Sequence, residues 1–374
     1  MTHYLSWWER SVLLRPFDFA VLGAGLLGKQ IAIRIQSQYP SARIALVDRS
    51  PVSYGASTRN AGFACFGSIS EILDDFHRSS ERDVIALAEK RYRGISELVA
   101  TFGAGAIDYK QCGGHEIFTD RGDLELAKDK LSYINKLLSA QLGVGPVFSL
   151  RSSASTGMRC EEECIFNPYE GMLNSGLLNE VISDIAHRAG IVPLYGLDIQ
   201  SLHSSGDGYT LLASNGMEVL CSQLILANNA FAAPFLPDED IQPARGQVLI
   251  TKPLEKLPFK GIFFSDKGYN YFRTVDKRVL IGGGRHLFRE QERTYAFGGS
   301  ENVREFLENY LREVVLPGLD FETDMHWSGI MAMGAEKMPI VRRVNDHLVI
   351  CVRMSGMGVA LGPVLSREVM ELLS

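Results

Sequence analysis

The stretch FDFAVLGAGLLGKQIAIRIQSQYPSARIALVDRS, residues 17–50, begins with an apolar run that is typical of a buried parallel strand. The glycine pattern G-x-G-x-x-G follows at Gly23, Gly25 and Gly28. A second apolar run ends just before Asp48. Two strands, a helix between them and an acid at the tip of the second strand make a complete βαβ unit. This combination predicts a dinucleotide-binding fold.

Each part of this unit has a physical task. Gly23 makes the tight turn, Gly25 lets the backbone approach a pyrophosphate, and Gly28 lets the helix pack close on the strand. The helix N-terminus, at Leu26 and Leu27, offers amide donors and the positive end of the helix dipole to the phosphates. The acid at the tip of the second strand is placed to accept hydrogen bonds from adenosine ribose hydroxyls.

The segment after the second strand, residues 49–71, is rich in Gly, Ala and Ser and contains Arg59, Asn60, Ala61 and Gly62. Small residues let the backbone crowd a flat ligand, and an arginine offers a two-pronged donor to phosphate. Such a segment leaves the strand tips where open α/β sheets bind their ligands. We therefore predict that it binds ligand rather than forming a plain surface loop.

The rest of the chain alternates between helical and extended patterns. Helices are predicted over residues 71–102, 121–142, 177–189, 303–315 and 363–373. Strands are predicted over residues 107–118, 191–194, 197–202, 209–213, 218–221, 223–230, 245–250, 269–275, 278–281 and 348–352, and turns over 166–168 and 171–174. A glycine turn, residues 354–359, follows the last strand and presents a second helix N-terminus.

Length and composition limit the classes of protein to consider. A chain of 374 residues exceeds the size at which a single core keeps growing, so two domains are expected. Hydrophobic residues make up 46% of the chain and charged residues 22%, as in a globular protein. The net charge of −6 gives no support for a nucleic-acid partner.

The cysteines and the N-terminus carry little signal. The six cysteines are scattered, so neither a disulfide framework nor a metal site is expected. No apolar run reaches the length of a membrane span, and the first residues lack the pattern of a signal peptide, so a cytoplasmic protein is expected. Trp7 and Trp8 suit either a membrane interface or packing on the first domain, and packing is the expectation.

These motifs, in this order, resemble the flavin-dependent D-amino-acid oxidase superfamily, which includes glycine oxidase, sarcosine oxidase and γ-glutamylputrescine oxidase. The landmarks that carry the resemblance are Gly23-x-Gly25-x-x-Gly28, Gly55-Ala56-Ser57-x-Arg59-Asn60-x-Gly62, Ala227-x-Asn229-Ala230, Arg245-Gly246-Gln247, Trp327-x-Gly329 with Pro339, and Ser355-Gly356-x-Gly358-Val359.

The resemblance implies an α/β fold, α+β overall. Its Rossmann-like FAD-binding domain is assembled from discontinuous segments, and its substrate domain has a large mixed β-sheet. The expected FAD-binding segments are residues 1–105, 165–240 and 327–374, and the expected substrate domain is residues 106–164 and 241–326. FAD, rather than NAD, is the implied dinucleotide. The flavin is expected to be non-covalent, because residues 354–358 contain no cysteine, and Cys65 is the one awkward candidate for a thioether.

The resemblance also assigns residues to the cofactor. Asp48 would bind the adenosine ribose, the stretch from Arg59 to Gly62 would line the pyrophosphate and flavin, and the turn from Ser355 to Gly358 would lie by the flavin ring. The full set of expected cofactor-binding residues is Gly23, Gly25, Leu26, Leu27, Gly28, Asp48, Arg49, Ser57, Thr58, Arg59, Asn60, Ala61, Gly62, Ala227, Asn228, Arg245, Ser355, Gly356, Met357, Gly358 and Val359.

Two departures from the superfamily concern the substrate carboxylate. Glycine and D-amino-acid oxidases carry a clamping arginine four residues after the tryptophan, where this chain has Met331 after Trp327. A second arginine of glycine oxidase is replaced by Gly356. We therefore expect either an amine without an α-carboxylate, whose methylene chain would suit Met331, or a clamp relocated to another arginine, with Arg285 the first choice. Arg245, Lys337 and Arg353 are the other candidates, and the expected catalytic residues are Arg285, Met331 and Trp327.

The implied reaction is oxidation of the C–N bond of a small amine or amino acid. A hydride would pass from the α-carbon to flavin N5, and the resulting imine would hydrolyse in water. Oxygen or another electron acceptor would reoxidise the flavin. Three alternatives stay open: an NAD(P)-dependent dehydrogenase, a flavin-dependent oxidase of a tRNA wobble-uridine side chain, and a non-catalytic flavin-binding protein.

Overall fold

The computed structural model describes residues 5–374, which form two compact units. Unit 1 comprises Met1–Thr58, Gly176–Pro243 and Met331–Ser374, and unit 2 comprises Arg59–Ser175 and Ala244–Ile330. Residues 59–105, expected in the FAD-binding domain, thus belong to unit 2. The reason is packing: the helices α3 (Ile69–Asp75), α4 (Glu81–Phe102) and α5 (Arg121–Leu142) contact one another.

Unit 1 is built on the sheet that the βαβ unit begins. Its core strands run parallel in the order β18 (Leu348–Val352), β11 (Glu218–Leu226), β1 (Phe17–Leu22), β2 (Ile44–Asp48) and β8 (Val192–Tyr195). Strand β17 (Ile340–Asn345) closes one edge antiparallel to β18. Leu22 is paired with Leu226 on one side and with Val47 on the other, so the carboxyl ends of these strands meet at one edge.

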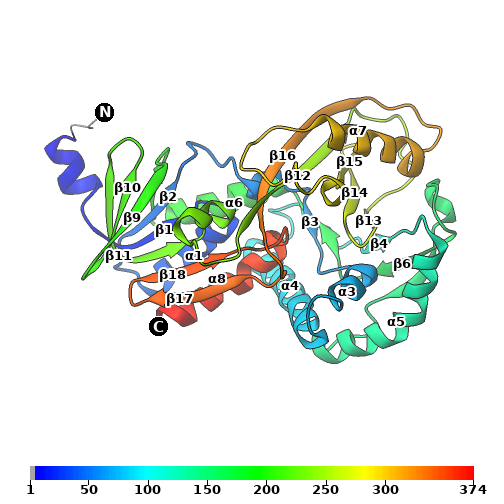
Figure 1. The fold of residues 1–374 in the computed structure, drawn as a ribbon, viewed down its shortest axis with the longest axis horizontal. Helices are drawn as coiled ribbons and strands as arrows, with labels where there is room; N and C mark the ends of the chain where they lie inside the picture. The colour runs from blue at the N-terminus through cyan, green and yellow to red at the C-terminus, as the bar shows by residue number, and fades with distance from the viewer. Residues whose placement is uncertain (1–4) are drawn as a thin grey trace. The chain divides into compact units, whose positions relative to one another are not determined.

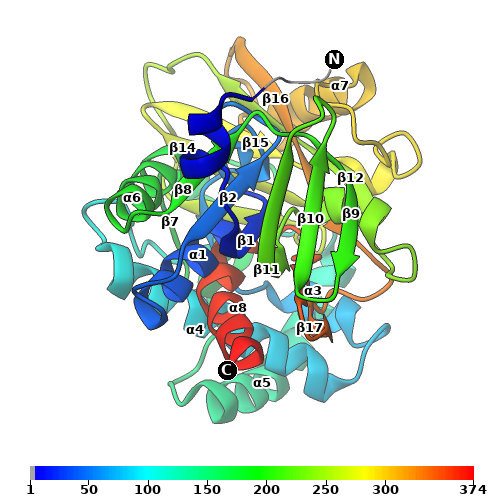
Figure 2. The ribbon, with the colours of Figure 1, turned by 90° about the vertical axis from the view of Figure 1, so that its left-hand side faces the viewer.

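Helices cover this sheet. The helix α1 (Leu26–Gln38) begins right after the glycine turn and packs on α8 (Gly358–Leu373), as Figure 2 shows. Helix α6 (Ser175–Arg188) is the third long helix, close to the prediction. Helix α8 begins at Gly358, five residues before the predicted start at Pro363, so the C-terminal glycine turn leads directly into it.

A meander extends the same sheet. Strands β9 (Ile199–Ser205) and β10 (Gly208–Ala213) pair antiparallel, and β10 pairs with β11. The sequence pattern divides β11 into two strands. The structure makes it continuous because its first half pairs with β10 while pairing with β1 begins at Cys221.

Unit 2 holds a second eight-stranded sheet (Figure 1). Its strands, in spatial order, are β16 (Thr323–Met333), β12 (Gln242–Thr251), β15 (Arg278–Gly282), β14 (Asn270–Val275), β13 (Ile262–Ser265), β4 (Gly114–Glu116), β6 (Glu163–Asn167) and β5 (Ser149–Ser152). The sheet is mixed, because β13 and β4 run parallel while the neighbouring pairs run antiparallel. Helix α7 (Glu301–Tyr310) supplies Val303 and Leu307 to its core.

Several expectations in unit 2 were wrong. The predicted strand 107–118 shrinks to β4, and Phe166 and Asn167, predicted in a turn, lie in β6. The short pairing of β3 (Phe63–Ala64) with β7 (Gly171–Met172) replaces the second predicted turn. Short strands that pair with distant partners leave little periodicity in the sequence, which explains these errors.

The N-terminal expectation was also wrong. Trp7 and Trp8 do not pack on unit 1, since 74% of each is exposed. They precede the short helical turn η1 (Glu9–Leu13), which contributes no buried side chain.

Candidate functional site

The glycine turn is shaped by contacts that only glycine allows. Gly23 has a φ of +111°, and a Cβ atom there would lie 2.7 Å from the backbone of Ala227 and Asn228. A Cβ atom on Gly28 would lie 1.8 Å from the carbonyl oxygen of Gly23. A Cβ atom on Gly25 would lie 2.7 Å from a side-chain oxygen of the segment formed by residues 49–58. The three glycines therefore let β11, α1 and that segment close on one turn.

Two polar side chains brace this turn from within unit 1. The carboxylate of Asp48 accepts hydrogen bonds from the backbone N–H groups of Ala24, at 2.8 Å, and Ser50, at 2.9 Å. The hydroxyl of Ser57 accepts from the N–H of Leu26 at 2.9 Å. Asp48 and Ser57 thus hold the turn in shape, in addition to the ligand contacts predicted for them.

The other expected residues of the segment 49–58 make local contacts. The guanidinium of Arg49 lies over the ring of Phe231, 3.6 Å from its centre. The hydroxyl of Thr58 donates to the carbonyl of Ser53 at 3.1 Å. These contacts order the segment on the side of the sheet where the glycine turn lies.

Buried oxygen atoms without a partner lie just beyond the carboxyl ends of β11 and β18. Among residues 5–374, the side-chain oxygens of Asn228, Asn229 and Ser355 are buried and form no hydrogen bond. A buried polar group without a partner costs free energy, so such groups indicate a bound molecule with complementary donors and acceptors. The ribityl hydroxyls and the isoalloxazine edge of FAD have this chemistry, and the residues present therefore fit FAD.

The C-terminal glycine turn contains the two positions where the carboxylate clamp is missing. Ser355 and Gly356 have φ values of +49° and +83°, and Met357 precedes the start of α8 at Gly358 and Val359. A Cβ atom on Gly356 would lie 3.3 Å from the sulfur of Met331. Met331 and Gly356 are therefore neighbours, as the resemblance implied.

In unit 2, the expected cofactor stretch contacts the expected catalytic tryptophan. The indole Nε1 of Trp327 donates to the carbonyl of Arg59 at 3.1 Å, and Nη1 of Arg59 donates to the carbonyl of Ser328 at 2.8 Å. The guanidinium of Arg59 lies 5.2 Å from the centre of the Phe297 ring. The Oδ1 of Asn60 accepts from the N–H of Gly62 at 2.9 Å. The fold of unit 2 thus brings Arg59 into contact with Trp327 and Ser328, which lie far from it along the chain.

Arg273 is the residue that sequence reasoning missed. It lies in β14, is 6% exposed, and its Nη1 donates to the carbonyls of Ala61, Gly62 and Leu173 at 3.2, 2.7 and 2.8 Å. Burial lowers its pKa below the usual value. Arg273 therefore fixes the backbone of the expected cofactor stretch. The only signal in the sequence was a charged side chain next to Phe272 inside a predicted strand.

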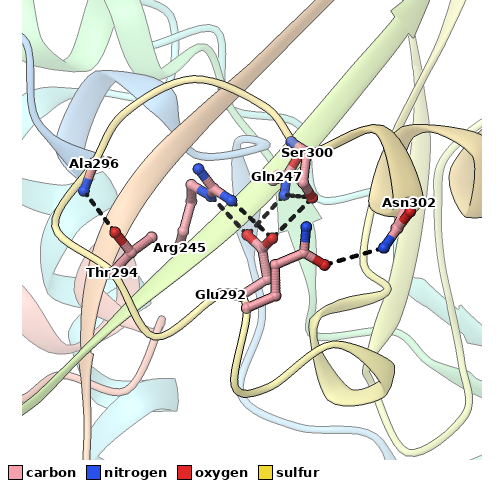
Figure 3. Close-up of polar contacts among 8 residues, drawn as sticks. Arg245, Gln247, Glu292, Thr294, Ala296, Ser300 and Asn302 are labelled. Carbon is pink, nitrogen blue, oxygen red and sulfur yellow. Dashed lines mark hydrogen bonds and ion pairs between the residues drawn. The ribbon is translucent and has the colours of Figure 1, made fainter.

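Arg245, expected at the cofactor or the substrate, is held elsewhere. Its guanidinium donates to both carboxylate oxygens of Glu292, Nε at 2.7 Å and Nη2 at 2.9 Å (Figure 3). Gln247 and Ser300 also donate to Glu292, at 2.7 and 2.8 Å. The hydrogen bond to Glu292 raises the pKa of Arg245. This two-pronged ion pair occupies the fork that a carboxylate or phosphate would use.

Two other arginines are candidates for the carboxylate clamp. The side chain of Arg353 already forms hydrogen bonds, whereas that of Arg285 forms none with the described residues. Arg353 donates to the carbonyls of Met338, at 3.0 Å, and Asp240, also at 3.0 Å. Arg285 follows β15, is half-buried, and its side chain forms no hydrogen bond or ion pair within the described residues 5–374. Burial lowers the pKa of Arg285, and Tyr269 and Tyr271 oppose that shift. Among the residues that the structure describes, Arg285 is therefore a partly desolvated cation without an ion-pair partner.

A buried acidic cluster also lies in unit 2. Glu170 is 1% exposed and accepts from the N–H groups of Phe66, at 2.9 Å, and Gly67, at 3.3 Å. Burial raises the pKa of Glu170 to about 8. Burial likewise raises the pKa of Glu116, which accepts from Ser68, to about 7. Near neutral pH Glu170 thus favours the protonated form, and Glu116 lies close to its titration midpoint.

We predict that Glu170→Gln removes a pH dependence of stability. In the unfolded chain this carboxyl ionises near the ordinary glutamate pKa of 4.5, whereas in the folded chain it stays protonated up to about pH 8. Between these values the unfolded state binds fewer protons, so stability falls as pH rises, by about 1.4 kcal/mol per pH unit for one group. The amide oxygen of glutamine keeps both backbone hydrogen bonds. Thermal melts from pH 5 to 8 should therefore favour the variant increasingly over wild type, and the exposed Glu162→Gln should show no such trend.

A second prediction concerns the glycine turn. Gly28→Ala should lose both FAD and folded protein, because its methyl group meets backbone that cannot move. Gly25→Ala should fold, because its methyl group meets a hydroxyl that can rotate away, but it should bind FAD more weakly. Flavin content after purification and circular dichroism measure the two effects. A Gly28→Ala variant with a full complement of FAD would contradict the assigned turn.

Comparisons with known proteins identify the family of this chain. The family described as DAO, FAD dependent oxidoreductase, matches residues 18–372. L-2-hydroxyglutarate dehydrogenase of Escherichia coli strain K12 is 22% identical over 79% of this chain and 72% of its own length. Within residues 5–374, no helix is both long enough and apolar enough to cross a membrane.

Solved structures share the fold. Glycine oxidase from Geobacillus kaustophilus superposes with a TM-score of 0.75 at 18% identity, covering 96% of this chain and 94% of that one. L-proline dehydrogenase from P. horikoshii superposes with a TM-score of 0.75 at 16% identity, with the same two coverages. The predicted fold class is confirmed.

Proposed function

The chain belongs to the FAD-dependent oxidoreductase family, and we propose that it oxidises the C–N bond of a small amino acid. FAD is the cofactor of this family, as the resemblance implied. When bound, FAD supplies the acceptor for the hydride that leaves the substrate α-carbon, and the imine product hydrolyses in water. The NAD(P)-dependent dehydrogenase, one of the alternatives left open, is set aside.

The proposed substrate class rests on one observation: the side chain of Arg285 has no ion-pair partner among the described residues. Leaving a cation partly buried and unpaired costs free energy, and a substrate carboxylate would remove that cost. The other two arginines considered for this role, Arg245 and Arg353, already have partners. This favours a relocated carboxylate clamp over an amine that lacks a carboxylate.

Aromatic residues of unit 2 would position the substrate and exclude water from the site. The aromatic group formed by Phe63, Tyr271 and Trp327 packs against the buried residues Ala61 and Leu280. Burial raises the pKa of Tyr271 to about 12, so it stays a neutral hydroxyl beside Arg285. No general base is required if the amine binds unprotonated, and positioning in a dry site supplies much of the rate.

A second candidate substrate is a 2-hydroxy acid. It is favoured by the match to L-2-hydroxyglutarate dehydrogenase. Such a substrate would present the same carboxylate to Arg285 but lose its hydride from a carbon that bears a hydroxyl. Both candidates therefore share the clamp. They differ in whether the carbon that loses the hydride bears an amine or a hydroxyl.

The test is anaerobic bleaching of the bound flavin by a panel of compounds. Small D- and L-amino acids, glycine and sarcosine form one arm, primary amines without a carboxylate a second arm, and 2-hydroxy acids a third. Fast bleaching by an amino acid supports the proposal. Fast bleaching by 2-hydroxy acids alone supports the second candidate, and bleaching by plain amines alone contradicts the role of Arg285.

We also predict that the flavin is bound without a covalent link. Cys65, the one candidate for a thioether, is buried, and burial raises its pKa well above the usual value, so its thiolate is disfavoured. Acid precipitation should release the yellow colour into the supernatant. A yellow pellet that turns colourless in Cys65→Ser would refute this.

A further inference from the structure

The N-terminal segment presents an apolar surface that the oxidoreductase chemistry does not use. Trp7 and Trp8 are each 74% exposed, Val12 is 62% exposed and Leu13 is 46% exposed. No other large apolar side chain among the described residues is as exposed as the two tryptophans. Figure 1 draws this segment in dark blue, ahead of β1. Exposed tryptophans are costly in water, and a group of them marks an interaction site.

This segment is fixed to unit 1 at its C-terminal end. The guanidinium of Arg43, which directly precedes β2, donates to the carbonyls of Val12 at 3.0 Å, Leu13 at 2.5 Å and Arg15. The same guanidinium lies over the ring of Phe17, 3.7 Å from its centre. Leu14 is buried at 7% exposure. The tryptophans are therefore displayed on an anchored segment, so less ordering entropy is lost when they bind.

The charge of the segment favours an anionic surface. Arg10 and Arg15 are both exposed beside the apolar side chains. The one acid, Glu9, is tied back to the N–H of Ser6 at 2.6 Å. Tryptophan prefers the level of lipid headgroups, where its ring is apolar and its N–H is wet, and neighbouring arginines attract anionic headgroups.

The size of the surface argues against a protein partner. Two tryptophans bury roughly 300–500 Å² when covered, and a stable protein interface needs about 800 Å² from each partner. A bilayer interface needs only a few such side chains together with basic residues. We propose that this segment docks the protein peripherally on an anionic lipid bilayer, with Trp7 and Trp8 in the headgroup layer.

Vesicle flotation of the FAD-loaded full chain tests this proposal. We expect binding to phosphatidylcholine vesicles that contain about 30 mol % phosphatidylserine, and weaker binding at about 0.5 M NaCl. Trp7→Ala/Trp8→Ala should weaken the binding by about tenfold or more, and Arg10→Glu/Arg15→Glu should weaken it several-fold. The matched control is Leu126→Ala/Tyr133→Ala, which removes two exposed apolar side chains of α5 in unit 2 and should leave binding unchanged.

Fluorescence gives an independent readout, because the chain has only three tryptophans. Brominated lipids should quench the emission of wild type and of Trp327→Phe, but not that of Trp7→Ala/Trp8→Ala. Flotation that is absent, or that survives in Trp7→Ala/Trp8→Ala, overturns the proposal. So does self-association in sedimentation without vesicles that this double variant abolishes, since it would assign the surface to a second copy of the chain. Flavin content of each variant shows whether the fold is retained.

Discussion

Arg285→Ala should abolish flavin bleaching by the amino-acid substrate while the protein keeps its FAD. Removing one partner of a desolvated charge pair costs about 2–5 kcal/mol, which corresponds to a loss of about 30- to 5,000-fold in the bleaching rate at low substrate concentration. The fold should survive, because the side chain of Arg285 makes no hydrogen bond or ion pair with the described residues 5–374. Stopped-flow bleaching under anaerobic conditions measures the effect.

Two further variants make this result specific. Arg285→Lys should retain part of the rate, because it keeps the charge but loses the planar fork. Arg293→Ala removes an exposed arginine of the following loop and should bleach like wild type. Undiminished bleaching by an amino acid in Arg285→Ala would remove the clamp from the proposal while leaving the amino-acid substrate in place. A plain amine as the fastest substrate would contradict both.

Glu292→Ala should destabilise unit 2 more than any other single removal of a carboxylate. The side chain of Glu292 is 1% exposed and that of its partner Arg245 is 10% exposed. Burial acts to raise the pKa of Glu292, but its hydrogen bonds, that from Arg245 foremost, outweigh it and hold the pKa below the usual value. Removing the carboxylate leaves a buried guanidinium unpaired, at a cost of about 3–5 kcal/mol. Urea unfolding followed by circular dichroism measures the shift in midpoint.

The double variant Arg245→Met/Glu292→Met is the informative control. It removes both charges and fills the space with apolar side chains, so it should be more stable than Glu292→Ala alone. Glu290→Ala, at an exposed position of the same loop, should unfold like wild type. If the double variant is less stable than Glu292→Ala, the ion pair contributes a net stabilisation that desolvation does not cancel, and the argument from buried charge fails.

The sequence by itself determined the dinucleotide-binding turn, and the family resemblance of its motifs predicted FAD as the cofactor. The turn at Gly23 and Gly28 follows from steric requirements that act within a few residues, and only glycine meets them. The helix α5 was predicted with its bounds, Arg121–Leu142, because helical periodicity is a local signal. The strand β1 was likewise predicted as a buried apolar run.

Only the tertiary structure decided which charged and apolar side chains have partners. Arg245, Arg285 and Arg353 look alike in the sequence, and the first is paired because Glu292, 47 positions away, folds against it. Arg273 became a bracing residue because β14 lies beside the carbonyls of residues 61, 62 and 173. Trp7 and Trp8 proved to be exposed because Arg43 holds the backbone carbonyls of their segment, and the tryptophan rings take no part in that anchoring. Pairing and burial depend on contacts between segments distant in the chain, and local sequence patterns do not encode those contacts.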